Sequence, residues 1–506
     1  MPNNELGDFQ TPLELANRIA SLLDAGRYRR VLEPTCGRGS FLDAVRGPDQ
    51  ERIGIEIQAG HVREAARFGT VLERNVFALR LDQDLPWTSS GRLLVVGNPP
   101  WVTNADLSRF GSANIPAKTN PKGLKGLEAR TGSANFDVAE YIWLKLVREL
   151  APQHPTIALL CKTQVARNVL AYCAANDLPV DGGRLHSIDS MRWFGAAVDA
   201  GLFVLHVRPG ARDYTAAVHD SLESGPTGRR FGVVDGRLVS DVDGYGATRA
   251  ADGECHLVWR QGVKHDATQV MELVDDRGTP RTKAGAVVDV EDEFLFPLLK
   301  STDVFRDRTT AATKWMVVPQ RGLADPTDTL PTRGPKLWTY LCAHAEALDG
   351  RKSSIYRNRP RFCVFGVGDY SFAPYKVAIS GMHKEPQFRL VAPRDGRPAV
   401  FDDTCYFLSF DDLAGAAVCC AVLRSSRATT LVESMVFWDS KRPITKKLLQ
   451  RVDLRALATL LDRDGVIGEA AALSHRAAGY DVDPAALDRA LAALVDPAPR
   501  PASAVS

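Results

Sequence analysis

The cysteines of this chain fit neither a disulfide framework nor a zinc ribbon. There are nine of them among 506 residues, an odd number, and no two stand in a Cys-x-x-Cys pair. Disulfide-rich secreted domains and zinc ribbons both need cysteines at short, regular spacings. His265 and His383 have no metal-ligand spacing around them either. We therefore expect reduced thiols and no metal site.

Long apolar runs and a leader sequence are also lacking. No stretch approaches the roughly 18 consecutive apolar residues that mark a membrane-spanning helix. The opening residues, MPNNELGDFQTP, have neither a basic start nor an apolar core, so no secretory signal peptide is expected. These features predict a cytoplasmic protein with no membrane partner.

A strong excess of charge of one sign is the third absence. Lys and Arg number 63 against 61 Asp and Glu, a formal net charge of +2. A nucleic-acid enzyme can balance an acidic rim against a basic groove, so local clusters decide more than the sum. The length allows two or three domains, each with its own hydrophobic core.

The first part of the chain alternates short apolar runs with amphipathic stretches. Strands are expected at 31–33, 53–57, 93–97, 157–161 and 202–207, and helices at 13–23, 40–45 and 138–150. This alternation predicts an α/β fold, a mostly parallel sheet covered on both faces. The second part is mixed, with strand-like runs at 375–380 and 404–410, and becomes helical near its end.

These shifts in composition give the expected domain boundaries. They delimit an α/β domain at 1–210, a connector with small β elements at 211–253, a mixed domain at 254–450, a helical segment at 451–495 and a disordered tail at 496–506.

A glycine-rich turn follows the first expected strand. Residues 31–41 read VLEPTCGRGSF, in which Gly37 and Gly39 allow a tight turn and a close approach to a ligand. No Lys follows as in a phosphate loop, and the pattern is not Gly-x-Gly-x-x-Gly. The next strand ends in Glu56, about twenty residues downstream, where an acid accepts both ribose hydroxyls in α/β nucleoside sites. Asn75 and Phe77 then stand where the amino edge and ring face of an adenine could be met.

The sequence Asn98-Pro99-Pro100-Trp101 follows an apolar strand. The two prolines fix φ and remove two N–H donors, so carbonyls there are not consumed by a regular helix. The side-chain oxygen of Asn98 and the carbonyl of Pro99 can each accept a hydrogen bond from an amino group. Trp101 offers a flat face for a stacked base. The pattern favours methyl transfer to an exocyclic amine, which positioning and polarisation activate without a dedicated base.

The order of these elements resembles the gamma class of amino-DNA methyltransferases, the adenine-N6 group. The family has an N-terminal Thr-Pro element, a glycine-rich motif, an acidic strand end, Asn-Pro-Pro-aromatic and a C-terminal target-recognition region. The matching residues lie within 7–207, and the resemblance is looser beyond. It implies a Rossmann-like S-adenosylmethionine-dependent methyltransferase domain followed by a mixed α+β target-recognition domain.

Site residues follow from the resemblance position by position. The cofactor-binding candidates are Phe9, Thr11, Glu33, Pro34, Cys36, Gly37, Gly39, Glu56, Asn75 and Phe77, with Phe9 and Thr11 at the methionine end. The candidates at the reacting base are Asn98, Pro99, Pro100, Trp101 and Phe194, with Phe194 opposite Trp101 across a flipped adenine. Residues 135–137, Asn-Phe-Asp, match the element that opens the helix at 138–150.

Two positions leave alternatives open. The family usually has Asp where Asn75 stands, and Trp193 rivals Phe194 for the face of the base.

Two alternative functions also stay open. RNA amino-methyltransferases share the Asn-Pro-Pro-aromatic motif, and the chain could also be a non-catalytic DNA-binding subunit of a defence complex. Cytosine-N4 enzymes usually carry Ser-Pro-Pro, so Asn98 favours adenine.

Basic clusters in the second half are expected to grip double-stranded DNA, because flipping a base out of the stack costs a few kcal/mol. They lie at 259–266, 351–397 and 440–447, and a glycine-rich basic loop at 118–130 is predicted to close over the DNA or the active site. The DNA-binding candidates are Lys118, Lys122, Lys125, Arg260, Lys264, Arg351, Lys352, Tyr356, Lys384, Lys441 and Arg442. The resemblance implies a role in restriction–modification or phage defence, beside a cognate endonuclease or another defence-complex subunit.

Overall fold

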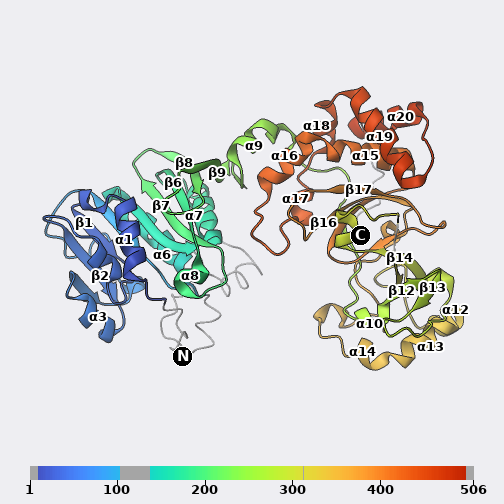
Figure 1. The fold of residues 1–506 in the computed structure, drawn as a ribbon, viewed down its shortest axis with the longest axis horizontal. Coiled ribbons are helices and arrows are strands. Elements are labelled where there is room, and N and C mark those ends of the chain that lie inside the picture. Colours follow the sequence, from blue (N-terminus) through green and yellow to red (C-terminus); the bar gives the residue numbers. More distant parts are fainter. Residues whose placement is uncertain (1–8, 103–136, 311–312, 497–506) are drawn as a thin grey trace. The chain divides into compact units, whose positions relative to one another are not determined.

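The chain folds into two compact units, Met1–Asp243 and Gly244–Ser506. This is seen in a computed structural model that describes residues 9–102, 137–310 and 313–496 (Figure 1). Within these ranges no helix combines the length and the apolarity that crossing a membrane requires.

The first unit is built on a ten-stranded sheet. Its strands are β1 (Arg30–Glu33), β2 (Glu51–Glu56), β3 (Thr70–Glu73), β4 (Leu93–Gly97), β5 (Thr156–Lys162), β6 (Val180–Ile188), β7 (Ala200–Val207), β8 (Arg212–His219), β9 (Pro226–Val234) and β10 (Arg237–Val239). Their order is β10-β9-β8-β6-β7-β5-β4-β1-β2-β3. Strands β3, β2, β1, β4 and β5 run parallel, and β7 lies antiparallel between β5 and β6. The predicted parallel core is confirmed.

Helices cover both faces of this sheet. They are α1 (Leu13–Leu22), α2 (Ser40–Ala44), α3 (Ala59–Ala65), α6 (Val138–Leu150), α7 (Thr163–Ala175) and α8 (Ser190–Phe194), and α9 (Val242–Thr248) lies where the units join along the chain. Helix α1 shares a core with Leu94, Val96 and Leu202. Trp143 of α6 packs at 4.9 Å on Phe203, the alternate residue of β7, so α6 lies on the opposite face.

Helix α6 shows why these segments fold as predicted. Its N-cap is Asp137, whose side chain accepts a hydrogen bond from the backbone N–H of Ala139. The second carboxylate oxygen of Asp137 lies 2.9 Å from Nζ of Lys162. Apolar residues then recur at helical spacing and are buried. The predicted bounds of α6 are confirmed.

The region expected as a connector, 211–253, folds differently. Strands β8, β9 and β10 extend the sheet of the first unit beyond β6. Glycines and arginines make this stretch look irregular in sequence, but its alternate residues pack against α7 and the sheet, as the buried Ala216 and Phe231 do. The first unit therefore ends at Asp243, not near 210.

The second unit holds two smaller sheets. One has the order β11-β19-β16-β17 and the other β13-β12-β15-β14-β18. Their strands are β11 (Arg260–Gln261), β12 (Glu272–Asp276), β13 (Thr279–Arg281), β14 (Leu295–Leu299), β15 (Lys314–Val317), β16 (Tyr375–Ser380), β17 (Phe388–Val391), β18 (Val400–Phe401) and β19 (Cys405–Phe410). The strands expected at 375–380 and 404–410 are β16 and β19.

The helices of the second unit are α10 (Thr268–Met271), α11 (Ser301–Phe305), α12 (Leu330–Arg333), α13 (Pro335–Ala343), α14 (Ala345–Asp349), α15 (Leu413–Arg424), α16 (Ser426–Met435), α17 (Lys446–Leu449), α18 (Leu454–Thr459), α19 (Arg463–Ala478) and α20 (Pro484–Val495). The apolar residues of α15 are buried almost all round, and α16, α18, α19 and α20 pack on it. Because α19 and α20 pack directly on α15, the helical segment expected at 451–495 belongs to the same compact unit.

Candidate active site

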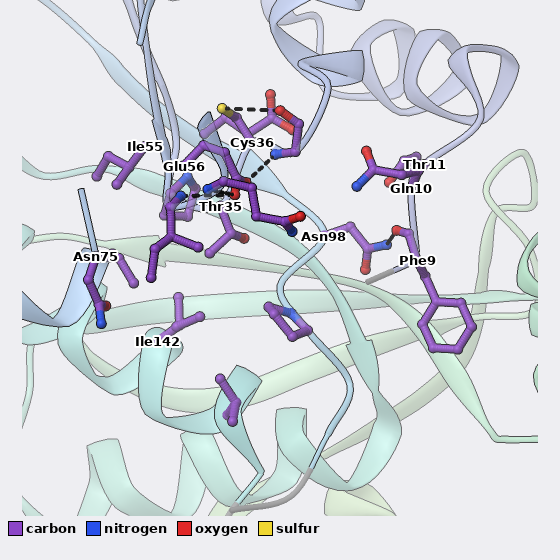
Figure 2. A pocket seen from close by; sticks show the side chains of 18 of the residues that line it. Phe9, Gln10, Thr11, Thr35, Cys36, Ile55, Glu56, Asn75, Asn98 and Ile142 are labelled. Atoms are coloured by element: carbon purple, nitrogen blue, oxygen red, sulfur yellow. Dashed lines mark hydrogen bonds between the residues drawn. The ribbon is translucent and has the colours of Figure 1, made fainter. Parts of the chain in front are cut away.

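A hollow of about 930 Å³, open to solvent, lies at the carboxyl ends of β1, β2 and β4. The strand order reverses between β1 and β4, and ligands of open α/β sheets bind at such a switch point. The predicted residues that line the hollow are Phe9, Thr11, Glu33, Pro34, Cys36, Gly37, Glu56, Asn75, Phe77, Asn98 and Pro100. Figure 2 shows how several of them converge from the N-terminal segment, the loop after β1 and the end of β2.

The loop after β1 requires its glycines for two different reasons. Gly37 has φ +49°, and a Cβ there would lie 2.6 Å from Oε1 of Gln10. Gly39 has φ +84° and faces Ala65, whose Cβ would lie 3.0 Å from an added Cβ. Gly37 also lines the hollow, whereas Gly39 does not. The need for glycine at position 39 is explained by its close packing on α3.

Glu56 ends β2 with its carboxylate held by the backbone. One oxygen accepts from the N–H of Gly37 at 2.8 Å, and the other accepts from Ile57 at 2.9 Å and Gln58 at 2.8 Å. The side chain is buried yet lines the hollow. Three fixed donors hold an acceptor at the place where the sequence predicts contact with ribose hydroxyls.

Glu33 and Cys36 sit deeper, and burial raises the pKa of both groups. Burial raises the pKa of Glu33 well above its usual range, although the N–H of Leu42 donates to its carboxylate at 3.1 Å. Burial also raises the pKa of the Cys36 thiol, and the nearby carboxylates of Glu33 and Glu56 raise it further. The Cys36 thiol is therefore not poised to act as a nucleophile.

Two further segments complete the wall. The carbonyl of Thr11 accepts a hydrogen bond from Oγ of Ser40 at 2.7 Å, which ties the N-terminal segment to α2. Oδ1 of Asn75 accepts from the N–H of Phe77 at 3.0 Å, and Phe77 packs edge-on against Tyr141 at 5.2 Å. Asn75 thus already uses the oxygen that the sequence predicts for an adenine amino group.

Asn98 presents a buried oxygen without a hydrogen-bond partner. Its Nδ2 donates to the backbone carbonyl of Phe9 at 2.9 Å, the dashed contact beside Phe9 in Figure 2. A carbonyl only accepts, so this contact determines which end of the amide is nitrogen. Oδ1 is buried with no partner among the described residues, and an unpaired buried acceptor costs about 1–3 kcal/mol. The site thus holds an unused acceptor beside the hollow.

Three aromatic rings meet next to Asn98. Trp101 and Phe194 lie 5.1 Å apart at 69°, and Phe9 lies 5.8 Å from Trp101 and 6.0 Å from Phe194. A base held between two rings needs about 7 Å between their planes, since stacked carbon atoms sit near 3.5 Å. The structure places Trp101 and Phe194 in mutual contact, without the gap that the predicted sandwich requires, so a base would have to part them. Trp193 lies instead between the guanidinium groups of Arg18 at 5.7 Å and Arg192 at 4.7 Å.

Several residues of the pocket wall were not predicted. Gln10, Thr35 and Ser40 come from the N-terminal segment and the loop after β1, and Val138 and Ile142 come from α6. Oε1 of Gln10 accepts from the N–H of Arg38 at 3.1 Å. Its place between Phe9 and Thr11 is the only sequence signal for it, whereas the two α6 residues read simply as core.

The DNA-binding candidates of the second unit divide into free and occupied side chains. Arg351 donates to the carbonyls of Leu348, His265 and Cys363, and Tyr356 donates to the carbonyl of Lys264. Arg442 pairs with Asp403 at 3.3 Å and Lys264 with Asp266 at 3.7 Å. Arg260 lies over Tyr370 at 4.4 Å. The exposed candidates are Lys352, Lys384 and Lys441.

The remaining predicted basic residues do not add to the exposed candidates. Lys376, counted with the basic cluster at 351–397, is fully buried, and burial lowers its pKa to about 7, so it contacts no DNA. Lys118, Lys122, Lys125, the loop at 118–130, and Asn135 and Phe136 lie outside the described residues. Within the described ranges no group of three or more His, Cys, Asp or Glu residues could hold a metal ion.

The doubly wound sheet with an antiparallel β7, the glycine loop and the acid ending β2 define a Rossmann-like S-adenosylmethionine-dependent methyltransferase. No protein-family model matches the chain. It is 36% identical over 470 residues to the type II methyltransferase M.NspV of Nostoc sp. (strain ATCC 29411 / PCC 7524), covering 90% of this chain and 98% of that one. The chain belongs to the type II methyltransferases, the modification enzymes of restriction–modification systems, and its methyl donor is S-adenosylmethionine.

Solved structures resemble the chain more distantly. The type IIL restriction–modification enzyme MmeI, solved in complex with DNA, matches with a TM-score of 0.48 and 12% identity, covering 95% of this chain and 71% of that one. A class I S-adenosylmethionine-dependent methyltransferase of Listeria monocytogenes matches with a TM-score of 0.30 and 13% identity, covering 42% and 67%.

Proposed function

We propose that the protein methylates the N6 amino group of an adenine flipped out of double-stranded DNA. The observation that carries this proposal is the unpaired Oδ1 of Asn98 beside the cofactor-sized hollow. An exocyclic amino group offers a donor to that oxygen, and the Asn-Pro-Pro order favours adenine over cytosine. The neutral amide suits a neutral amine, since no charge has to be matched in the ground state.

The residues that line the hollow suit the methyl donor by their polar groups and rings. Glu56 offers its carboxylate to ribose hydroxyls, Gly37 leaves room for close approach, and Phe77 offers a ring face. Thr11 and Phe9 form the wall nearest Asn98. S-adenosylmethionine, when bound, supplies an electrophilic methyl group.

The chain itself prepares the amine. Oδ1 of Asn98 and the carbonyl of Pro99 accept hydrogen bonds from the two N6 hydrogens, which draws the nitrogen lone pair out of conjugation with the ring. When N6 takes the methyl group, the methyl–sulfur bond of the donor would break and its sulfur would keep the electron pair as a neutral thioether. The nitrogen, cationic after the transfer, would then release one proton to solvent. Because an amine that has taken the methyl group is strongly acidic, the step needs no dedicated base. Trp101 and Phe194 hold the base once they have parted.

The second unit is proposed to recognise the target sequence. Its free cations Lys352, Lys384 and Lys441 are available for phosphate contacts, and Arg260 carries a guanidinium stacked on Tyr370. Lys118, Lys122 and Lys125 remain predictions. In the cell, we propose that the enzyme protects host DNA beside a cognate endonuclease or another defence subunit.

The test is to incubate the protein and donor with unmodified genomic DNA and to sequence it by a method that reports N6-methyladenine. We expect methylated adenines within one short sequence context, which also identifies the recognition site. Tritiated methyl incorporated into ribosomal RNA but not DNA would overturn the proposal in favour of an RNA enzyme. Cofactor binding without methylation of either polymer would favour a non-catalytic subunit.

A further inference from the structure

The short helix α8 carries an exposed apolar side chain beside the closed aromatic cluster. In the described part of the first unit, four large apolar side chains are exposed: Leu13, Ile57, Met191 and Val198. Met191, at 55%, is the most exposed of the four. A single exposed apolar residue needs no explanation. Met191 differs from the other three because it shares the short helix α8 with Phe194.

Met191 is three residues before Phe194 on the same helical turn. Residues at this spacing occupy neighbouring positions on a helix surface. Phe194 packs inward on Trp101 at 5.1 Å, whereas Met191 remains in solvent. The same turn therefore carries one apolar side chain in the aromatic cluster and a second one that is exposed to solvent.

This turn is held rigidly. The carboxylate of Asp189 caps it by accepting from the N–H of Arg192 at 2.9 Å, and Oγ of Ser190 donates to the carbonyls of Ala196 and Val198. Gly195 ends the helix at φ +66°. The backbone of this turn is therefore held in place, whereas the exposed Met191 side chain keeps its rotamer freedom.

We propose that Met191 is a positioning residue that enters the base stack where the target adenine leaves it; this rests on the proposed DNA substrate. Extruding a base opens a gap in the duplex and costs a few kcal/mol of pairing and stacking. An apolar side chain that fills the gap repays part of this cost, as wedge residues of DNA-bending proteins do. Methionine is unbranched and adapts its shape to an irregular gap.

The experiment compares two duplexes that carry the recognition site: one fully paired, and one with an abasic site opposite the target adenine. In the second duplex pairing to the target is already absent. The wild type, Met191→Ala, Met191→Leu and Val198→Ala are assayed for kcat/KM on both. Val198 is the matched control, an exposed apolar residue of the same loop outside the α8 turn. Binding of S-adenosylhomocysteine checks that each variant keeps the cofactor pocket.

We expect Met191→Ala to lose about tenfold in kcat/KM on the paired duplex and to come within about twofold of wild type on the abasic one. Met191→Leu and Val198→Ala should stay close to wild type on both. An equal loss of Met191→Ala on both duplexes, or no loss on either, overturns the wedge while the wild-type activity upholds the DNA substrate. A wild type that methylates neither duplex overturns both proposals.

Discussion

The two sides of the catalytic edge differ in how far they are built before any ligand arrives. On the cofactor side, Glu56 is held by three backbone N–H groups and borders an open hollow. On the base side, Phe9, Trp101 and Phe194 pack on one another and leave no gap for a ring. The donor site is preformed, whereas the acceptor site must open. In the proposed reaction, the methyl donor arrives freely from solution and finds a ready site, whereas an adenine extruded from a duplex would have to part the rings as it enters.

Asn98 stands at the junction of the two sides, and its replacement should have the largest effect. Asn98→Ala removes the free acceptor and the hydrogen bond to the Phe9 carbonyl. We expect methylation of DNA to fall about 10²–10³-fold, the usual loss when one preorganised polar group of a reacting centre is removed. Single-turnover kinetics measure this, and calorimetry with S-adenosylhomocysteine should show nearly unchanged affinity. Unchanged turnover would contradict the proposed chemistry.

Replacing Glu56 tests whether the cofactor side can be weakened without changing the affinity for DNA. Glu56→Gln removes the charge that the three N–H groups hold, and charge-assisted hydrogen bonds contribute about 1.5–3 kcal/mol each. We expect the affinity for S-adenosylhomocysteine to fall about ten- to a hundredfold, with DNA affinity little changed.

Glu51→Gln is the matched control for Glu56. Glu51 begins the same strand, and its carboxylate accepts from the N–H groups of Thr88 and Ser89 away from the hollow. Its replacement should leave cofactor affinity intact. Equal losses in the two variants would indicate that β2 was disturbed as a whole.

The same contrast separates what could be predicted from the sequence. Strands β1, β2 and β4 and helix α6 follow from apolar runs and capping residues, so the cofactor side could be assembled from local patterns. Strand β3 is only four residues long and half-exposed, and it carries no such pattern. The contact between Asn98 and Phe9 joins residues 89 positions apart, and the collapse of three aromatic rings depends on packing. Neither is visible in a local pattern.

Replacing Phe194 and Trp193 separately tests which of the two rings stacks on the base. Phe194 packs with Trp101, whereas Trp193 lies between two guanidinium groups. Phe194→Leu should lower kcat/KM for DNA about tenfold, because stacking of one base on an aromatic ring contributes about 1–3 kcal/mol. Trp193→Leu should lower it much less. Fluorescence of 2-aminopurine at the target position reports extrusion directly, and a larger loss in the Trp193 variant would exchange the two roles.

The smallest expected effect lies in the second unit, where neighbouring residues Arg351 and Lys352 repeat the contrast between an occupied and a free group. Lys352 is exposed, and if it contacts a phosphate, Lys352→Ala should weaken DNA binding a few-fold and reduce the slope of log K against log salt by about one.

Arg351 donates to three backbone carbonyls. Arg351→Ala should therefore lower the free energy of unfolding by about 1–3 kcal/mol, because buried acceptors lose their donor. Salt titrations and thermal melts of both variants separate these outcomes. A changed salt slope for Arg351→Ala without any loss of stability would show that the hydrogen bonds of Arg351 give way to DNA.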